Sequence, residues 1–233
     1  MTPVASAAPA CRLPLWHAAL LGGVLALSGC AGLFHSNAAP EQTYVLRAPP
    51  PPAASAPAAS AGAALASPAG LPSIRVTQPD ADPGLDSPHI ILVQADHRLD
   101  FYAGSRWPGP APDLVGALAV ETLRASGAWQ SVEDSDSPFP SEYLLRIKLR
   151  RFEADYTGGG PAPEVHVVLD CVIGRREGRE VVASFSAQGT ATASADRMSA
   201  VVNAFEQATD EALESLARQS RTAVAAAGAT AGR

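Results

Sequence analysis

Cysteine is scarce in this sequence, which contains three in 233 residues: Cys11, Cys30 and Cys171. Small secreted domains that are held together by disulfides need several cysteine pairs, so this pattern excludes a disulfide framework. Stability must therefore come from a buried apolar core, and the chain is long enough to form one.

Catalytic motifs are also missing. The sequence contains no Gly-x-Ser-x-Gly nucleophile elbow, no Gly-x4-Gly-Lys-Ser/Thr phosphate loop, no His-Glu-x-x-His zinc helix and no Cys-x-x-Cys pair. His166 and Cys171 lie an odd number of residues apart in one predicted strand, which places them on opposite faces. The acidic run at 133–136 favours a turn over a calcium site. We therefore expect no catalysis, no bound metal and no cofactor.

Positive charge is limited, because 17 Lys and Arg face 23 Asp and Glu and the formal net charge is −6. This balance argues against binding of nucleic acid and against broad adhesion to anionic lipid. Arg146, Lys148 and Arg150 form a local basic row along one predicted strand. A solvated face explains this row better than contact with a partner or with lipid headgroups.

No apolar run reaches the roughly 20 residues that a membrane-spanning helix needs. The run at 13–27 follows a positive residue, holds no acidic residue and is typical of a signal peptide. It ends in Leu27-Ser28-Gly29-Cys30, which resembles the processing box of bacterial lipoproteins. The resemblance implies that residues 1–29 are removed and that Cys30 is lipidated, with an ordinary secretory signal as the alternative.

A lipidated Cys30 anchors the chain to a membrane without a transmembrane helix. Residue 31 is Ala, and not the Asp that retains many lipoproteins at the inner membrane. We therefore expect a protein of the cell envelope, anchored in the outer membrane and facing the periplasm.

Composition divides the mature chain into a tether and a domain. Residues 30–72 form the lipidated N-terminus and an Ala/Pro-rich tether, in which the part from 48 to 72 cannot bury enough apolar surface to order itself. A short β-prone run at 43–47 precedes that part and is able to dock as a strand. We expect the tether to space a globular domain, residues 73–219, from the membrane, and residues 220–233 to form a frayed tail.

Strand patterns begin at Ile74–Val76 and continue at His89–Val93 and Arg98–Tyr102. The second of these runs is apolar throughout, which indicates burial on both faces. The residues between the second and third runs are turn-like, so the two runs predict a β-hairpin.

Three further strands predict a β-meander. The first, Tyr143–Tyr156, alternates apolar and polar residues and changes phase near Arg150 and Arg151, which indicates a β-bulge. Two turns then lead into strands at 164–173 and 181–187, and Cys171 belongs to the inward set of the former.

Two amphipathic helices complete the pattern. Pro112 and Asp113 open the first, and Gly127 closes it. The second runs from Asp196 to Gln219, with apolar residues at helical spacing. Together these patterns predict a single α+β domain, in which a mostly antiparallel sheet is covered by the two helices.

The order of these parts resembles that of the ABC-type transport auxiliary lipoproteins, the PqiC-like family. In that family a Tyr-x-Leu strand, a Leu-x-x-Pro-x-Ile strand, an Arg-Leu-x-Phe hairpin strand and a Trp before the first helix recur. The residues that stand in those places here are Tyr44, Leu46, Leu85, Pro88, Ile90, Arg98, Leu99, Phe101 and Trp107. The long Ala/Pro-rich insertion and the Pro108-Gly109-Pro110 segment depart from the family's pattern.

The resemblance implies a non-catalytic subunit of an MCE-type ABC transport system that moves phospholipid or other lipophilic molecules and supports membrane integrity. Its implied partners are an MCE-domain protein, a permease and an ATPase. A pilotin-like assembly lipoprotein and, less favoured, a lipid-anchored hydrolase remain as alternatives. Homo-oligomerisation, the cargo and the direction of transport stay open.

Trp107 is the residue whose role the sequence leaves most open. A large aromatic side chain between a hairpin and a helix either caps the core or anchors a partner. Core capping is favoured, and partner binding remains the alternative. We expect a partner-binding surface near Trp107 and the strand that carries Arg98 and Phe101.

Overall fold

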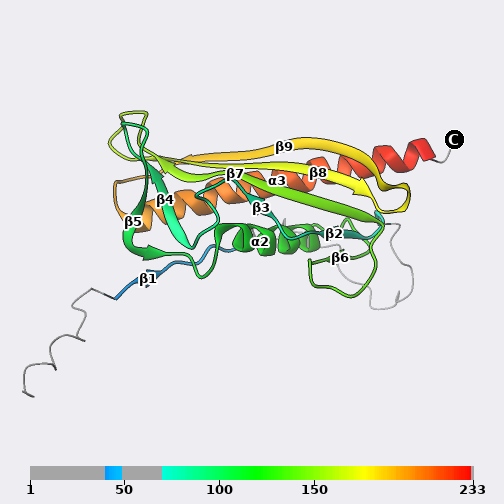
Figure 1. The fold of residues 1–233 in the computed structure, drawn as a ribbon. Helices are drawn as coiled ribbons and strands as arrows, with labels where there is room; N and C mark the ends of the chain where they lie inside the picture. The colour runs from blue at the N-terminus through cyan, green and yellow to red at the C-terminus, as the bar shows by residue number, and fades with distance from the viewer. Residues whose placement is uncertain (1–39, 49–69, 232–233) are drawn as a thin grey trace, which may run out of the picture. The chain divides into compact units, whose positions relative to one another are not determined.

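The computed structural model describes residues 40–48 and 70–231; the signal region, Cys30 and most of the Ala/Pro-rich tether lie outside these ranges. Within them the chain forms two α-helices and one mixed sheet of nine strands (Figure 1). The elements in chain order are β1 (Gln42–Thr43), β2 (Ile74–Val76), β3 (Asp80–Ala81), β4 (His89–Val93), β5 (Leu99–Arg106), α2 (Ala111–Ala125), β6 (Val132–Glu133), β7 (Tyr143–Asp155), β8 (Glu164–Arg175), the 3-10 turn η1 (Glu177–Arg179), β9 (Glu180–Thr192) and α3 (Met198–Ala231).

The three longest strands, β7, β8 and β9, form the predicted antiparallel meander. Before the bulge, Leu145, Ile147 and Leu149 of β7 point into the core. The register shifts between Leu149 and Arg151, which confirms the predicted β-bulge. The extra residue changes the parity of the strand, so that Phe152 and Ala154 point inward after it.

The other edge of β7 corrects the expectation of a mostly antiparallel sheet. Strands β2, β3 and β4 pair with successive parts of this edge, and all three run parallel to β7. β6 pairs in parallel with β2. Parallel pairing needs a crossover connection, which helix α2 supplies between β5 and β7. The sheet is therefore mixed, and the fold is α+β with an antiparallel meander on one side only.

Strands β4 and β5 form the predicted hairpin, with antiparallel pairing from His89 to Val93. Ile90, Ile91 and Leu92 are all buried, as the apolar run predicted. His97 adopts a φ of 65° in the turn between the strands. The β4–β5 hairpin is thus an arm whose inner strand joins β7 and whose outer strand, β5, lies towards the edge of the sheet.

Both helices pack on the face of the sheet that carries the apolar side chains of the meander. Helix α3 lies along β8 and β9, while α2 contacts α3, β2 and β7. Helix α3 does not end at Gln219, as its pattern suggested, but continues to Ala231. Val224 in this extension is 1% exposed, so apolar contact with the domain continues past the expected end. Neither helix combines the length and apolarity that a transmembrane span requires.

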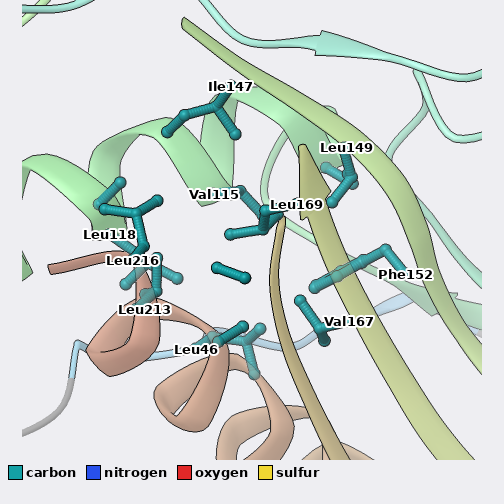
Figure 2. Packing of buried hydrophobic residues seen from close by; sticks show 14 of the residues in the cluster. Leu46, Val115, Leu118, Ile147, Leu149, Phe152, Val167, Leu169, Leu213 and Leu216 are labelled. Carbon is teal, nitrogen blue, oxygen red and sulfur yellow. The ribbon is translucent and has the colours of Figure 1, made fainter. Parts of the chain in front are cut away.

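The centre of the core is shown in Figure 2, where Val115 and Leu118 of α2 approach Leu213 and Leu216 of α3. Leu169 of β8 lies among them. Cys171, two residues further along β8, is 1% exposed, which confirms it as a core residue.

An aromatic cluster extends this core between the sheet and the start of α3. The ring centroids of Trp107 and Phe205 lie 5.3 Å apart, and those of Phe152 and Phe205 lie 5.1 Å apart. Trp107 has no exposed surface. Such tilted and edge-to-face arrangements are the favoured geometries of aromatic pairs, and they join the three elements that carry these residues.

The segment 42–48, which we call the N-terminal strap, is part of the domain. Gln42 and Thr43 pair in parallel with Ser105 and Arg106 of β5, so the strand is shorter than the predicted run at 43–47. Leu46 is 3% exposed and belongs to the core cluster. The Ala/Pro-rich stretch therefore lies, in chain order, between two docked parts of the domain. If the chain is anchored at Cys30, a stretch that follows the docked strap does not lengthen the connection between the membrane and the domain.

Candidate partner-binding surface

Two large apolar side chains of β5 point away from the core. Leu99 is 57% exposed and Phe101 is 49% exposed. Phe101 faces Ile91 across the hairpin, and Ile91 in turn pairs with Glu153 of β7. Because paired residues project to the same side of a sheet, the two apolar side chains lie on the face opposite the helices.

The aromatic ring of Phe101 has a fixed place on this face. The ring of His89 stacks against it with centroids 4.6 Å apart and an interplanar angle of 22°. Leu99 lies beside Gly84, where a Cβ atom would meet Leu99 Cδ2 at 3.1 Å. Both exposed side chains are thus supported from one side, which lowers the entropy that a partner would have to remove on binding.

The outer edge of β5 is open along most of its length. Its described partner on that side is β1, which pairs only with Ser105 and Arg106. Within the described ranges, the backbone groups of residues 99–104 on this edge therefore have no neighbouring strand. An unpaired strand edge is a template for addition of a further strand. We define the hairpin surface as Arg98, Leu99, Phe101 and this free edge.

The hairpin is fixed to the rest of the domain by a chain of hydroxyl groups. The hydroxyl oxygens of Tyr102 and Tyr156 lie 2.9 Å apart, and Tyr156 donates to Asp196 Oδ1 at 2.7 Å. Burial, the hydrogen bond to Tyr156 and the charge of Asp196 raise the pKa of Tyr102. Burial also raises the pKa of Tyr156, so both tyrosines stay neutral and bridge β5, the residue after β7 and the segment before α3.

A charged cluster lies next to the hairpin surface on β7. Arg151 contacts Glu153 Oε1 at 2.5 Å and Asp155 Oδ2 at 3.0 Å. Glu153 is only 6% exposed and also accepts the Phe152 backbone N–H at 2.8 Å. Although burial opposes ionisation, hydrogen bonds from Thr157 and Arg151 hold the pKa of Asp155 below its usual value. Arg151 thus pairs with both carboxylates, and the cluster gives the surface a polar border.

The structure separates the three residues that the sequence grouped as a partner-binding site. Phe101 and Arg98 are on the surface, where Arg98 forms an exposed ion pair with Asp96 at 2.9 Å. Trp107 is fully buried in the aromatic cluster. Trp107 therefore has the core role that the sequence favoured. The expectation that Trp107 itself contacts a partner is corrected, because its side chain is not accessible.

The sequence placed Leu99 in the hairpin strand but did not predict its exposure or the free edge of β5. Leu99 alternates with polar neighbours, which would equally suit a side chain that points into the core. The available signal was the pair of apolar residues Leu99 and Phe101, two residues apart. Whether such a pair is buried or exposed depends on what covers that face of the sheet, which the sequence does not show.

The basic row is neutralised by the segment around β3. Lys148 Nζ lies 2.8 Å from Asp82 Oδ1, and Arg150 Nε lies 3.0 Å from Asp82 Oδ2. Arg146 approaches Asp80 at 3.7 Å. The hydrogen bond and charges from Lys148 and Arg150 lower the pKa of Asp82. Arg150 Nε also lies 3.8 Å from Asp170 Oδ2, so three carboxylates face the three cations and the row is a solvated, paired face.

The cysteine and the acidic groups show no catalytic arrangement. Burial raises the pKa of the Cys171 thiol to about 12, so the thiolate that nucleophilic chemistry needs is not formed at neutral pH. His166 lies on the other face, beside Glu164 at 3.4 Å. Among the residues that the structure describes, no three His, Cys, Asp or Glu side chains converge as metal ligands.

Comparison with known proteins gives one family. The family model described as "ABC-type transport auxiliary lipoprotein component" matches residues 44–217. No curated protein matches the chain. A crystal structure of protein XCC0632 from Xanthomonas campestris, assigned to family DUF330, is 27% identical, with a TM-score of 0.63 over 78% of this chain and 96% of that one.

A second crystal structure supports the fold alone. It is described as an uncharacterized protein and is 14% identical to this chain. The match covers 65% of this chain and 94% of the other, with a TM-score of 0.54.

Proposed function

Because the chain belongs to the family of ABC-type transport auxiliary lipoprotein components, we propose that it is a non-catalytic subunit of an MCE-type ABC transport system in the cell envelope. In this role it binds an MCE-domain protein or the permease and ATPase complex, and the assembled system moves phospholipid or another lipophilic molecule. The chain itself contributes binding and no bond-making step.

The exposed hairpin surface supports this role. It combines two exposed apolar side chains, Leu99 and Phe101, with an open strand edge. A few well-packed side chains near the centre of an interface supply most of its binding free energy, and a strand edge adds backbone hydrogen bonds in a defined register. Both features suit a protein partner that adds an extended segment to β5.

The second part of the proposal is the anchor. We propose that Cys30 is acylated and that the chain stays attached to the outer membrane through it. The Cys30→Ala variant should remain an unprocessed precursor without lipid, because the thiol is the acceptor. Mass spectrometry of the purified protein measures this directly. A mature terminus at another residue in the wild type would contradict the anchor and the localisation that follows from it.

The partner proposal is tested by capture of the MCE-domain protein from detergent-solubilised envelopes. A Phe101→Ser and Leu99→Ser double variant should lose at least tenfold in recovered partner, since truncating an interface anchor costs about 2 kcal/mol or more. Val181→Ser is the matched control, because Val181 is 63% exposed but lies outside the hairpin surface. It should capture the partner like the wild type.

Circular dichroism and urea unfolding of each variant show whether the fold is kept. The two substituted side chains are exposed, so the free energy of unfolding should change by less than about 1 kcal/mol. Equal capture by the double variant and the wild type would reject the hairpin surface as the interface. Failure of the folded wild type to capture any transporter component would reject the transporter role itself.

A further inference from the structure

A hollow of about 290 Å³ lies on the outer face of the sheet, away from the hairpin surface. Its lining contains two arginines and no acidic residue: Arg75, Pro138, Phe139, Pro140, Ser141, Leu144 and Arg176. Arg75 is the middle residue of β2 and pairs with Leu144 of β7. Positive charge and apolar surface therefore border the same small space.

The loop that covers Arg75 is folded around its guanidinium group. Arg75 Nη2 donates to the carbonyl oxygen of Ser137 at 2.9 Å and also to that of Phe139. Phe139 stands between two prolines and is 66% exposed. Because proline restricts the backbone on both sides, the backbone that carries the ring is restrained beside the hollow.

Polar donors beside the hollow lack partners. Arg75 Nε and Ser141 Oγ are buried and make no hydrogen bond. Ser141 as a whole residue is 5% exposed. The Arg176 side chain forms no ion pair with the residues that the structure describes, unlike Arg175, which approaches Glu180 at 3.9 Å. The charge beside the hollow is therefore only partly compensated, because Arg176 has no carboxylate partner among the described residues and the carbonyl oxygens around Arg75 carry no formal charge.

We infer that this hollow binds an amphiphilic anion, with a phosphate or carboxylate group between Arg75 and Arg176 and an apolar stem against Phe139 and Leu144. Guanidinium groups recognise such oxyanions through charge-assisted hydrogen bonds. Glu133 moderates the local charge, since it accepts the Ser137 hydroxyl at 2.5 Å and lies close enough to Arg75 for the two charges to interact. It does not line the hollow.

The test is an NMR titration of the purified full-length chain with hexyl phosphate, inorganic phosphate and hexanol. The arginine Nε–Hε signals and the Phe139 amide report binding at the site. Hexyl phosphate should bind about tenfold more tightly than inorganic phosphate, because burial of part of its apolar stem adds to the binding free energy. Hexanol should cause no saturable shift of the arginine signals.

Two variants separate the anion from the stem. Arg176→Gln should weaken hexyl phosphate about tenfold, as expected for a lost charge-assisted hydrogen bond, while Arg179→Gln on the same turn lies outside the hollow and should leave affinity unchanged. Phe139→Ala should weaken hexyl phosphate but not inorganic phosphate. If Arg176→Gln bound as well as the wild type, or if inorganic phosphate bound as tightly as hexyl phosphate, the inference would be overturned.

This inference is independent of the proposed transporter role. The titration contains no transporter component, and the capture experiment contains no added amphiphile. Either result can therefore fail without the other.

Discussion

Gly189 marks the closest approach between β9 and helix α3. A Cβ atom at this position would lie 2.1 Å from the Ala208 carbonyl oxygen and 2.9 Å from the Ala212 nitrogen. Both alanines are buried on the helix face that meets the strand. Small residues on both sides thus allow backbone to pack on backbone, and a side chain at 189 would have to push the helix away.

We predict that Gly189→Ala lowers the free energy of unfolding by about 1–3 kcal/mol or more, the usual range for overpacking a core. Urea unfolding followed by circular dichroism measures the change. Gly158→Ala is the control, since a Cβ there meets no atom within 4 Å. A Gly189→Ala variant as stable as this control would show that the helix and strand are not in rigid contact.

Trp107 shows where the sequence could not decide at the scale of one residue. Its place before a helix suited both a core cap and an interface anchor. The decision depends on Phe152 and Phe205, which lie 45 and 98 positions later in the chain and meet it only in the folded domain. Phe101 shows the opposite outcome. It is exposed because, among the described residues, no layer covers the face of the sheet opposite the helices.

Helix α3 carries a row of acidic residues at helical spacing, Glu206, Asp210 and Glu214. Partial burial, together with the charges of Glu206 and Glu214, raises the pKa of Asp210 from its ordinary value of 3.8 to about 6. The folded state therefore binds this proton more tightly than the unfolded state. By linkage, the contribution of Asp210 to stability is lost as pH rises from about 4 through about 6.

We predict that Asp210→Asn stabilises the domain at pH 7.5 and has little effect at pH 4.5. The gain at the higher pH should stay below about 1 kcal/mol, because solvent screens a partly exposed group. The urea midpoints of wild type and variant at both pH values measure it. Glu121→Gln on α2, away from the acidic row, should show no such pH-dependent gain. A variant that is destabilised equally at both pH values would contradict this account.

The elements that the sequence predicted well are those with long periodic patterns. The strands of the meander repeat a two-residue period, and both helices repeat a helical period. The bulge was visible because it shifts the two-residue period of β7. Strands β3 and β6 are two residues long, so they carry no period and were not predicted. Strand β2 was predicted at Ile74–Val76, but its parallel pairing with β7 was not, because that pairing depends on the crossover through α2. The extension of α3 to Ala231 was missed because its Ala-rich composition has little amphipathic contrast.

The N-terminal strap determines how the whole molecule holds together. Tyr44 donates its backbone N–H to the Arg106 carbonyl oxygen at 2.9 Å, and Leu46 lies in the core cluster near Leu213 (Figure 2). The sequence indicated that 43–47 was β-prone, but a run of five residues does not reveal whether it docks permanently. The burial of Leu46 and the pairing of Gln42 and Thr43 with β5 make the strap a structural part of the domain.

We predict that the strap keeps the protein in one piece after the Ala/Pro-rich stretch is cut. With a protease site inserted between Ala58 and Ala59, cleavage should leave the domain on the membrane, and adding Leu46→Asp should release it by placing a charge in the core. Sedimentation of membranes before and after cleavage measures release. A site between Ala38 and Ala39 is the control and should release the domain in either background. Immediate release from the first cut alone would contradict permanent docking.

A docked strap also shortens the chain segment that connects the domain to its membrane. If Cys30 carries the lipid as proposed, only the residues from Cys30 to Glu41 separate the membrane from the domain, and a fully extended chain of this length spans about 40 Å. The long Ala/Pro-rich stretch adds nothing to that distance. The domain can therefore sample only a thin layer next to its own membrane, so a partner anchored in the opposite membrane would have to extend most of the way across the intervening space to meet it.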